Sequence, residues 1–138
     1  MLDLKALLTK ILQRLVNIGT VYTASSVTNI TNASIDSPTN GASLTLPAGT
    51  YILLGEWHFT TRTTTGTTNS QIAFRNGASG GVYAMVRVFA SGNNWNSLKT
   101  SSVQVFSQST TVYLCGSTSR PTTSTTGTTN WFLAIRIK

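Results

Sequence analysis

The stretch SLTLPAGTYILLGEWHF, residues 43–59, decides the fold class of this 138-residue chain. Its apolar residues form two runs on either side of Pro47-Ala48-Gly49, and proline followed closely by glycine is typical of a tight turn. Neither run repeats with the 3.6-residue period of an amphipathic helix. The stretch therefore predicts two strands joined by a turn.

The same pattern continues to the C-terminus. Short apolar runs separated by polar turns recur at QIAFR (71–75), VYAMVRVFA (82–90), SVQVF (102–106), TTVYLC (110–115) and WFLAIRIK (131–138). We expect SVQVF and TTVYLC to pair with each other. Several strands of four to nine residues predict an all-β sandwich or barrel over residues 41–138. Residues 20–40 are polar with isolated apolar points, which indicates a linker that becomes the first strands.

The last apolar run is unusual because both of its faces are apolar. Trp131, Leu133 and Ile135 alternate with Phe132 and Ala134. A strand that is apolar on both faces is typical of a central position in a sheet. We therefore predict that this strand is central, with one face in the sandwich core and the other in a subunit interface.

The first nineteen residues, MLDLKALLTKILQRLVNIG, predict a helix. Their apolar residues are spaced 4, 3, 4 and 3 apart, which is a heptad seam formed by Leu4, Leu8, Ile11, Leu15 and Ile18. Asp3 is suited to cap the start of the helix, and Gly19 is suited to end it. Leucine at the a positions with isoleucine at the d positions favours three or more strands, so we predict a trimer.

Two alternatives for this helix remain open: packing against its own domain, and lying on a membrane surface. Two heptads are too short to be stable alone, so a bundle would depend on a larger trimeric head. The predicted organisation is an oligomerisation helix at 1–19, a linker with first strands at 20–40 and a β-sandwich head at 41–138.

Charge and composition exclude several classes of function. Charged residues make up 9% of the chain, whereas ordinary soluble domains have ~25%. The net charge of +7 is spread over single residues, so no basic arm for nucleic acid is present. No run is long enough to span a membrane. A secretory signal is not expected, because Lys10 and Arg14 interrupt the first apolar stretch. The diffuse positive field either attracts anionic polymers or only aids solubility.

The chain resembles a known class of trimeric heads. The resemblance rests on the N-terminal helix followed by LPAGTYILLGEWHF (46–59), TTVYL (110–114) and WFLAIRI (131–137). This order resembles jelly-roll heads of the C1q/TNF-like type, which occur at the tips of bacteriophage fibres. The opening LDLKALLTKIL (2–12) is similar to the start of short fibre proteins from phages of Gram-positive gut bacteria. No collagen repeat precedes the head, which favours the phage branch.

The resemblance implies a homotrimer with strands near the axis and outer loops that bind receptor saccharides. It also implies a place on the virion surface, with the N-terminal helix contacting other virion proteins.

Residues suited to catalysis are few. Glu56 and His58 lie two apart on one strand and so share a face, but no second carboxylate is near them in sequence. We expect a hydrogen-bonded structural pair there and no enzyme activity. One histidine, one cysteine and three acids do not provide a zinc site within one chain, although copies of His58 around a trimer axis are an alternative. No cofactor is expected, and Cys115 is predicted to be a buried, inert thiol.

Residues suited to binding a saccharide lie in three polar segments. SGNNWNS (91–97), predicted as a loop, offers an aromatic face and amides, and the segments 60–70 and 117–130 each offer hydroxyls and one arginine. The alternative is that the tryptophan fills the end of the sandwich or the subunit interface and that the other segments are plain turns. The candidate ligand residues are Asn93, Asn94, Trp95, Asn96, Arg62 and Arg120.

Two of these segments contain the same hexapeptide, TTGTTN, at 64–69 and 125–130. Each copy is followed by an apolar run that ends in arginine, and we hypothesise that both copies lie at one pole of the head.

Taken together, the sequence predicts a trimeric phage fibre tip that attaches to bacterial surface carbohydrate. The alternative is a structural fibre or decoration protein without a dedicated ligand, and a cell-wall hydrolase is more remote.

Overall fold

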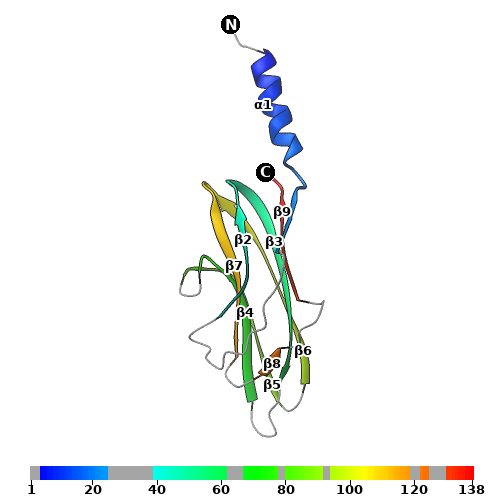
Figure 1. The fold of residues 1–138 in the computed structure, drawn as a ribbon, viewed down its shortest axis with the longest axis vertical. Helices are drawn as coiled ribbons and strands as arrows, with labels where there is room; N and C mark the ends of the chain where they lie inside the picture. Colours follow the sequence, from blue (N-terminus) through cyan, green and yellow to red (C-terminus); the bar gives the residue numbers. More distant parts are fainter. Residues whose placement is uncertain are drawn as a thin grey trace.

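The computed structural model consists of one helix that projects from a two-sheet β-sandwich (Figure 1). It describes residues 4–24, 39–61, 67–77, 80–91, 94–118, 122–124 and 130–138. The elements, in chain order, are α1 (Leu4–Val16), β1 (Val21–Thr23), β2 (Thr39–Leu46), β3 (Gly49–Thr61), β4 (Thr67–Arg75), β5 (Val82–Ser91), β6 (Asn94–Phe106), β7 (Thr110–Thr118), β8 (Thr122–Ser124) and β9 (Trp131–Arg136).

The strands form a jelly roll. One sheet has the order β1-β9-β3-β6, with the short β8 paired to the end of β3, and the other has the order β2-β7-β4-β5. All the pairings are antiparallel. The first, last, third and sixth strands face the second, seventh, fourth and fifth strands, as in a double-sheet jelly roll. The predicted all-β jelly-roll sandwich with a short N-terminal helix is confirmed.

The expected pairing of SVQVF with TTVYLC is wrong. These runs belong to β6 and β7, which follow each other in sequence but lie in different sheets. β6 pairs along its whole length with β3, and β7 pairs with β2 and β4. The turn at 47–48 likewise leads from β2 in one sheet to β3 in the other. These two short turns therefore connect the sheets, as the double-sheet jelly roll requires.

The core fills the space between the sheets. Its inward residues follow a period of two along each strand; those with the largest fully buried side chains include Trp57, Tyr51, Phe74, Phe132, Leu46, Leu53, Leu114 and Val112. Phe74 and Phe132 come from opposite sheets, and their ring centroids are 5.1 Å apart. β9 lies between β1 and β3, and its residues Phe132 and Ala134 are fully buried, so the predicted central position of this strand is confirmed.

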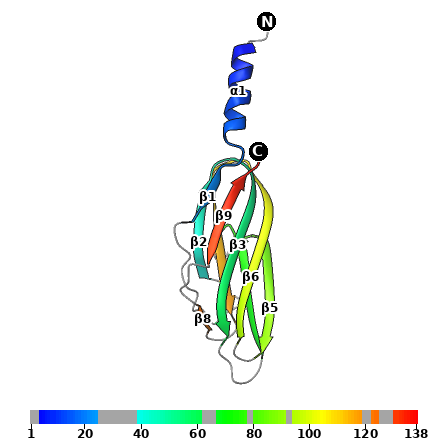
Figure 2. The same cartoon turned by 90° about the vertical axis from the view of Figure 1, so that its right-hand side faces the viewer.

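Helix α1 stands away from the sandwich in both ribbon views (Figures 1 and 2). The alternative in which it packs on its own domain is therefore wrong. Gly19 has a φ of 84°, the left-handed conformation expected where a helix ends in glycine. Asp3 lies outside the described residues. No helix in the described part of the chain has the length and apolar character needed to cross a bilayer.

Two backbone hydrogen bonds fix the junction between α1 and the sandwich. The Gly19 N–H donates to the Arg136 carbonyl at 2.7 Å, and the Arg136 N–H donates to the Thr20 carbonyl at 2.9 Å. The Arg136 guanidinium also donates to the Ala48 carbonyl at 2.9 Å, which ties the end of β9 to the β2–β3 turn. The segment after the helix is thus held to the last strand.

Candidate functional site

An apolar area lies on the outer face of the β1-β9-β3-β6 sheet. Residues directly opposite each other in this sheet share a face, and the register places Ile52 opposite both Ile135 and Val103. We call this area the apolar face; it consists of Val21, Ile52, Leu54, Val103, Val105, Leu133 and Ile135. Val103 is 61% exposed and Val105 is 74% exposed. Ile52, Leu54, Leu133 and Ile135 are partly buried. A contiguous apolar area on an outer sheet face is typical of an interaction surface.

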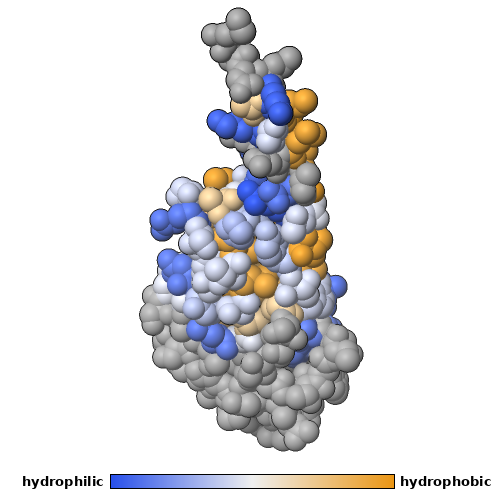
Figure 3. Space-filling model, turned by 45° about the horizontal axis from the view of Figure 1, so that its top comes forward, coloured by the Kyte–Doolittle hydropathy of each residue, from blue (hydrophilic) through white to orange (hydrophobic). Residues whose placement is uncertain are grey.

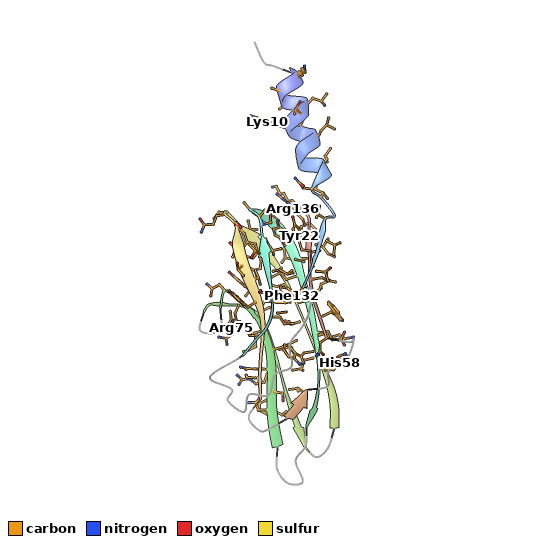
Figure 4. All side chains as sticks on the ribbon, in the orientation of Figure 1. Lys10, Tyr22, His58, Arg75, Phe132 and Arg136 are labelled. Carbon is orange, nitrogen blue, oxygen red and sulfur yellow. The ribbon has the colours of Figure 1, made fainter. Side chains whose placement is uncertain are left out.

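The apolar seam of α1 is equally exposed. Leu8 and Leu15 are 55% and 57% exposed, and Ile11 and Ile18 are about as open to solvent. No side-chain position is described for Leu4, which begins the helix. In Figure 3 the apolar residues of the helix lie on the same side as apolar residues of the sandwich. Figure 4 places Lys10 on the opposite side of the helix.

A polar cluster lies beside the apolar face, on the same side of the sheet and farther from the helix. We call it the Glu56 cluster; its members are Glu56, His58, Ser97, Lys99 and Trp131. The register sets Glu56 of β3 opposite Lys99 of β6 and Trp131 of β9, and His58 opposite Ser97. Figure 4 shows His58 on this side of the molecule and Arg75 on the other. Adjacent strands therefore bring together side chains that lie far apart in sequence.

Glu56 is only 9% exposed, and its carboxylate is surrounded by donors. The Ser97 hydroxyl donates to Oε1 at 2.5 Å, and the Trp131 indole N–H donates to Oε2 at 2.9 Å. His58 Nε2 lies 3.0 Å and Lys99 Nζ lies 3.5 Å from Oε1. The expected structural pair of Glu56 and His58 is thus part of a larger network.

The pKa of Glu56 is lower than usual for glutamate. Burial raises this pKa, but the hydrogen bonds from Ser97 and Trp131 and the charges of Lys99 and His58 lower it by more. Glu56 therefore keeps its negative charge into acid. A carboxylate held in this ionised state is a poor proton donor, and the described residues offer no second carboxylate beside it.

The metal-binding residue types do not cluster within the described part of one chain, where no group of three or more His, Cys, Asp or Glu residues suits an ion. Cys115 is buried, and burial raises its pKa to about 11. Its Sγ lies 3.0 Å from Oδ1 of Asn40, to which the thiol donates. The prediction of a buried thiol is confirmed.

The candidate ligand residues are only partly described. Arg62, Asn93 and Arg120 lie outside the described residues. The prediction that Trp95 lies in a loop is wrong: Asn94, Trp95 and Asn96 form the start of β6, with backbone pairing to Thr61, Thr60 and Phe59. The cluster of glycine and asparagines resembles a turn locally, but the long β3 continues to its end and offers a pairing partner there.

Strand ends next to all the candidate ligand residues meet at the pole opposite the helix. Thr61, which precedes Arg62, pairs with both Asn94 and Thr122, and Thr67 pairs with Ser91 (Figure 1). The structure therefore brings the flanks of the three predicted segments together, although side-chain positions at this pole are not described.

The two TTGTTN copies differ in how the structure uses their last residue. Asn69 lies within β4, opposite Phe89, whereas Asn130 precedes β9 and its side-chain oxygen accepts the His58 N–H at 2.8 Å. This contact fills the gap on β3 between its pairing with β9 and its pairing with β8. Residues 64–66 and 125–129 lie outside the described residues, so the hypothesis of a shared pole stays a prediction.

Sequence reasoning identified Trp131, Leu133 and Ile135 as interface candidates but missed the rest of the apolar face. The signal was present in TYILL, which is apolar on both faces, and in SVQV, where valines alternate with polar residues; Ile52 and Val103 fall on the side opposite the core. It also missed the partners of Glu56, because nothing in the sequence says that β3 lies between β6 and β9.

No family model matches this sequence, and a search of curated proteins finds no match. Among solved structures the chain is similar to proteins of infectious bursal disease virus, each match covering 86% of this chain. They come from the T13 viral particle (16% identity, TM-score 0.47), the Gt strain (17%, 0.45) and the VP2 subviral particle (17%, 0.43). The matches cover 31%, 33% and 32% of those chains, so this chain spans about a third of their length.

Proposed function

We propose that this chain is the head of a homotrimeric virion fibre, a non-enzymatic module that attaches a bacteriophage to a carbohydrate or anionic polymer on the bacterial surface. The observation that supports this most strongly is that the exposed seam of α1 and the apolar face of the sandwich lie on the same side of the molecule (Figure 3).

The junction makes this arrangement suited to self-assembly. The Gly19 and Arg136 hydrogen bonds hold the segment after the helix against β9, the strand that carries Leu133 and Ile135. Copies that join through their helix seams therefore turn their apolar faces toward a common axis. The leucine and isoleucine pattern of the seam favours a bundle of three or more helices, and the trimer is the smallest.

The trimer would separate two tasks along the long axis. The helix pole faces the particle, where α1 contacts other virion proteins. The opposite pole gathers the strand ends next to Trp95, Arg62 and Arg120, and this pole faces the cell. Individual saccharide sites are weak, and linked copies gain avidity.

Thiol labelling tests the assembly. Val103→Cys lies on the apolar face and Phe89→Cys on the other sheet, and the native residues are similarly exposed at 61% and 66%. We expect maleimide to label both variants equally at dilutions where the protein is monomeric. At higher concentration only the Val103→Cys variant should be protected. Buried Cys115 contributes no background. A wild-type chain that stays monomeric at micromolar concentration would contradict the proposal.

Binding to host cell walls or to a glycan array tests the attachment. We expect the wild-type trimer to bind and both Trp95→Ala and Arg120→Ala to weaken binding without changing the oligomeric state. Absence of binding to host and non-host cell walls alike would leave the alternative of a structural fibre protein with no ligand of its own.

A further inference from the structure

We propose that the Glu56 cluster is a charge lock in the subunit interface: Glu56 neutralises Lys99 where copies of the sheet face meet, and loss of its negative charge drives the copies apart. This inference rests on the self-assembly in the proposed function. It assigns a role to the Glu56 cluster, which that self-assembly does not otherwise involve.

The Glu56 cluster lies on the same outer face of the sheet as the apolar face. Glu56 follows Ile52 and Leu54 at a spacing of two on β3, so its side chain lies on the same outer face as theirs. The two residues that donate hydrogen bonds to it, Ser97 and Trp131, come from the strands on either side, β6 and β9. Any copy that covers the apolar face therefore comes close to the cluster as well.

Positive charge is in excess on this chain, and Glu56 lies beside one of the positive side chains. The chain has a net charge of +7, and Glu56 is the one acid among the residues that the structure describes. Lys99 is 72% exposed at its side chain, so it projects toward an approaching copy, while the carboxylate stays beneath it. Assembly brings the Lys99 side chains of several copies toward one axis. With Glu56 ionised each lysine has its own counter-charge.

The groups that face Glu56 determine what its removal does. From β3 the facing group is His58 and from β6 it is Lys99, whereas Ser97 and Trp131 are neutral donors. Among the described residues of β1 and β8 none is titratable and directed at the carboxylate. Removing one member of a desolvated ion pair leaves an uncompensated charge, whereas removing both members is often nearly neutral. Recovery of assembly on removing both charges would therefore indicate a charge lock, whereas no recovery would indicate a packing role.

The test uses the full chain and the protein concentration at which half of the trimer dissociates, measured by light scattering at neutral pH. We expect Glu56→Gln to raise this concentration about tenfold or more, as an unpaired charge in an interface predicts. The double variant Glu56→Gln with Lys99→Gln should restore most of the wild-type value. Arg87→Gln is the matched control: it removes the two hydrogen bonds to Gln71 on the other sheet, and we expect no change.

The possible results distinguish failure of the charge lock from failure of the proposed function. An unchanged dissociation concentration in Glu56→Gln, with the wild type trimeric, would overturn the charge lock and leave the proposed function standing. A double variant as weak as the single one would also overturn it, because the defect would then come from lost hydrogen bonds. A trimer that responds as expected but binds no host surface would retain the lock and refute the attachment.

Discussion

The exposed seam of α1 allows its contribution to assembly to be calculated from the structure. Leu8 and Leu15 occupy the a positions and are each a little more than half exposed in the free chain. Full burial of a leucine side chain contributes about 2 kcal/mol, so burial of the exposed half contributes about 1 kcal/mol. Replacing both by serine should therefore remove about 2 kcal/mol per chain and about 6 kcal/mol per trimer.

This loss has a measurable consequence. About 6 kcal/mol corresponds to about four decades in the overall association constant of the trimer. Because that constant scales with the square of concentration, the concentration for half-dissociation should rise by about two decades. Light scattering over a dilution series measures this concentration directly.

The matched control is Ala6→Ser with Lys10→Ser, since both residues lie outside the seam and lose at least as much helix propensity on replacement. We expect the control to retain the wild-type profile. The melting of the head in its monomeric form should be unchanged in both variants, because α1 stands off the sandwich (Figure 2). Dissociation at the wild-type concentration in the seam variant would refute the reasoning, as would an equal loss in the control.

Three further predictions concern the head. Gly41→Ala places a methyl group against the ring of buried Trp57 and should destabilise the fold by about 2 kcal/mol or more, whereas Gly81→Ala meets only ordinary contacts and should be neutral; urea unfolding measures both. The lowered pKa of Glu56 adds stability above pH 4.5 that is lost as pH falls through the pKa of Glu56 in the folded chain. Glu56→Gln should remove this pH dependence when the free energy of unfolding is measured over an acid titration. A pH dependence unchanged in the variant would contradict the prediction. Native Cys115 should resist maleimide at pH 8 and react only on unfolding; rapid labelling of the folded chain would contradict its burial.

The candidate site could be predicted in part. Trp131, Leu133 and Ile135 were identifiable because a strand apolar on both faces must bury one and cover the other. The place of Trp95 was predicted wrongly, because its neighbours favour a turn and only the length of β3 shows that a partner strand continues there. Lys99 and Ser97 gave no signal, since single polar residues on a strand look alike in sequence.

The sequence by itself determined the local geometry of this protein. The heptad spacing of residues 4–18 defined the helix and its seam, and the period of two along each strand defined which side chains share a face. Both are properties of neighbours along the chain, so they can be read from spacing alone.

Only the tertiary structure decided which strands are neighbours. β6 and β7 are joined by a short turn and lie in different sheets, whereas Glu56 meets Ser97 across 41 residues and Trp131 across 75. Strand pairing depends on how all the inner faces are buried at once between two layers, and that condition involves the whole chain. The tertiary structure also decided that the helix seam and the apolar face lie on the same side of the molecule. The hydrogen bonds between Gly19, Thr20 and Arg136 at the junction set this orientation.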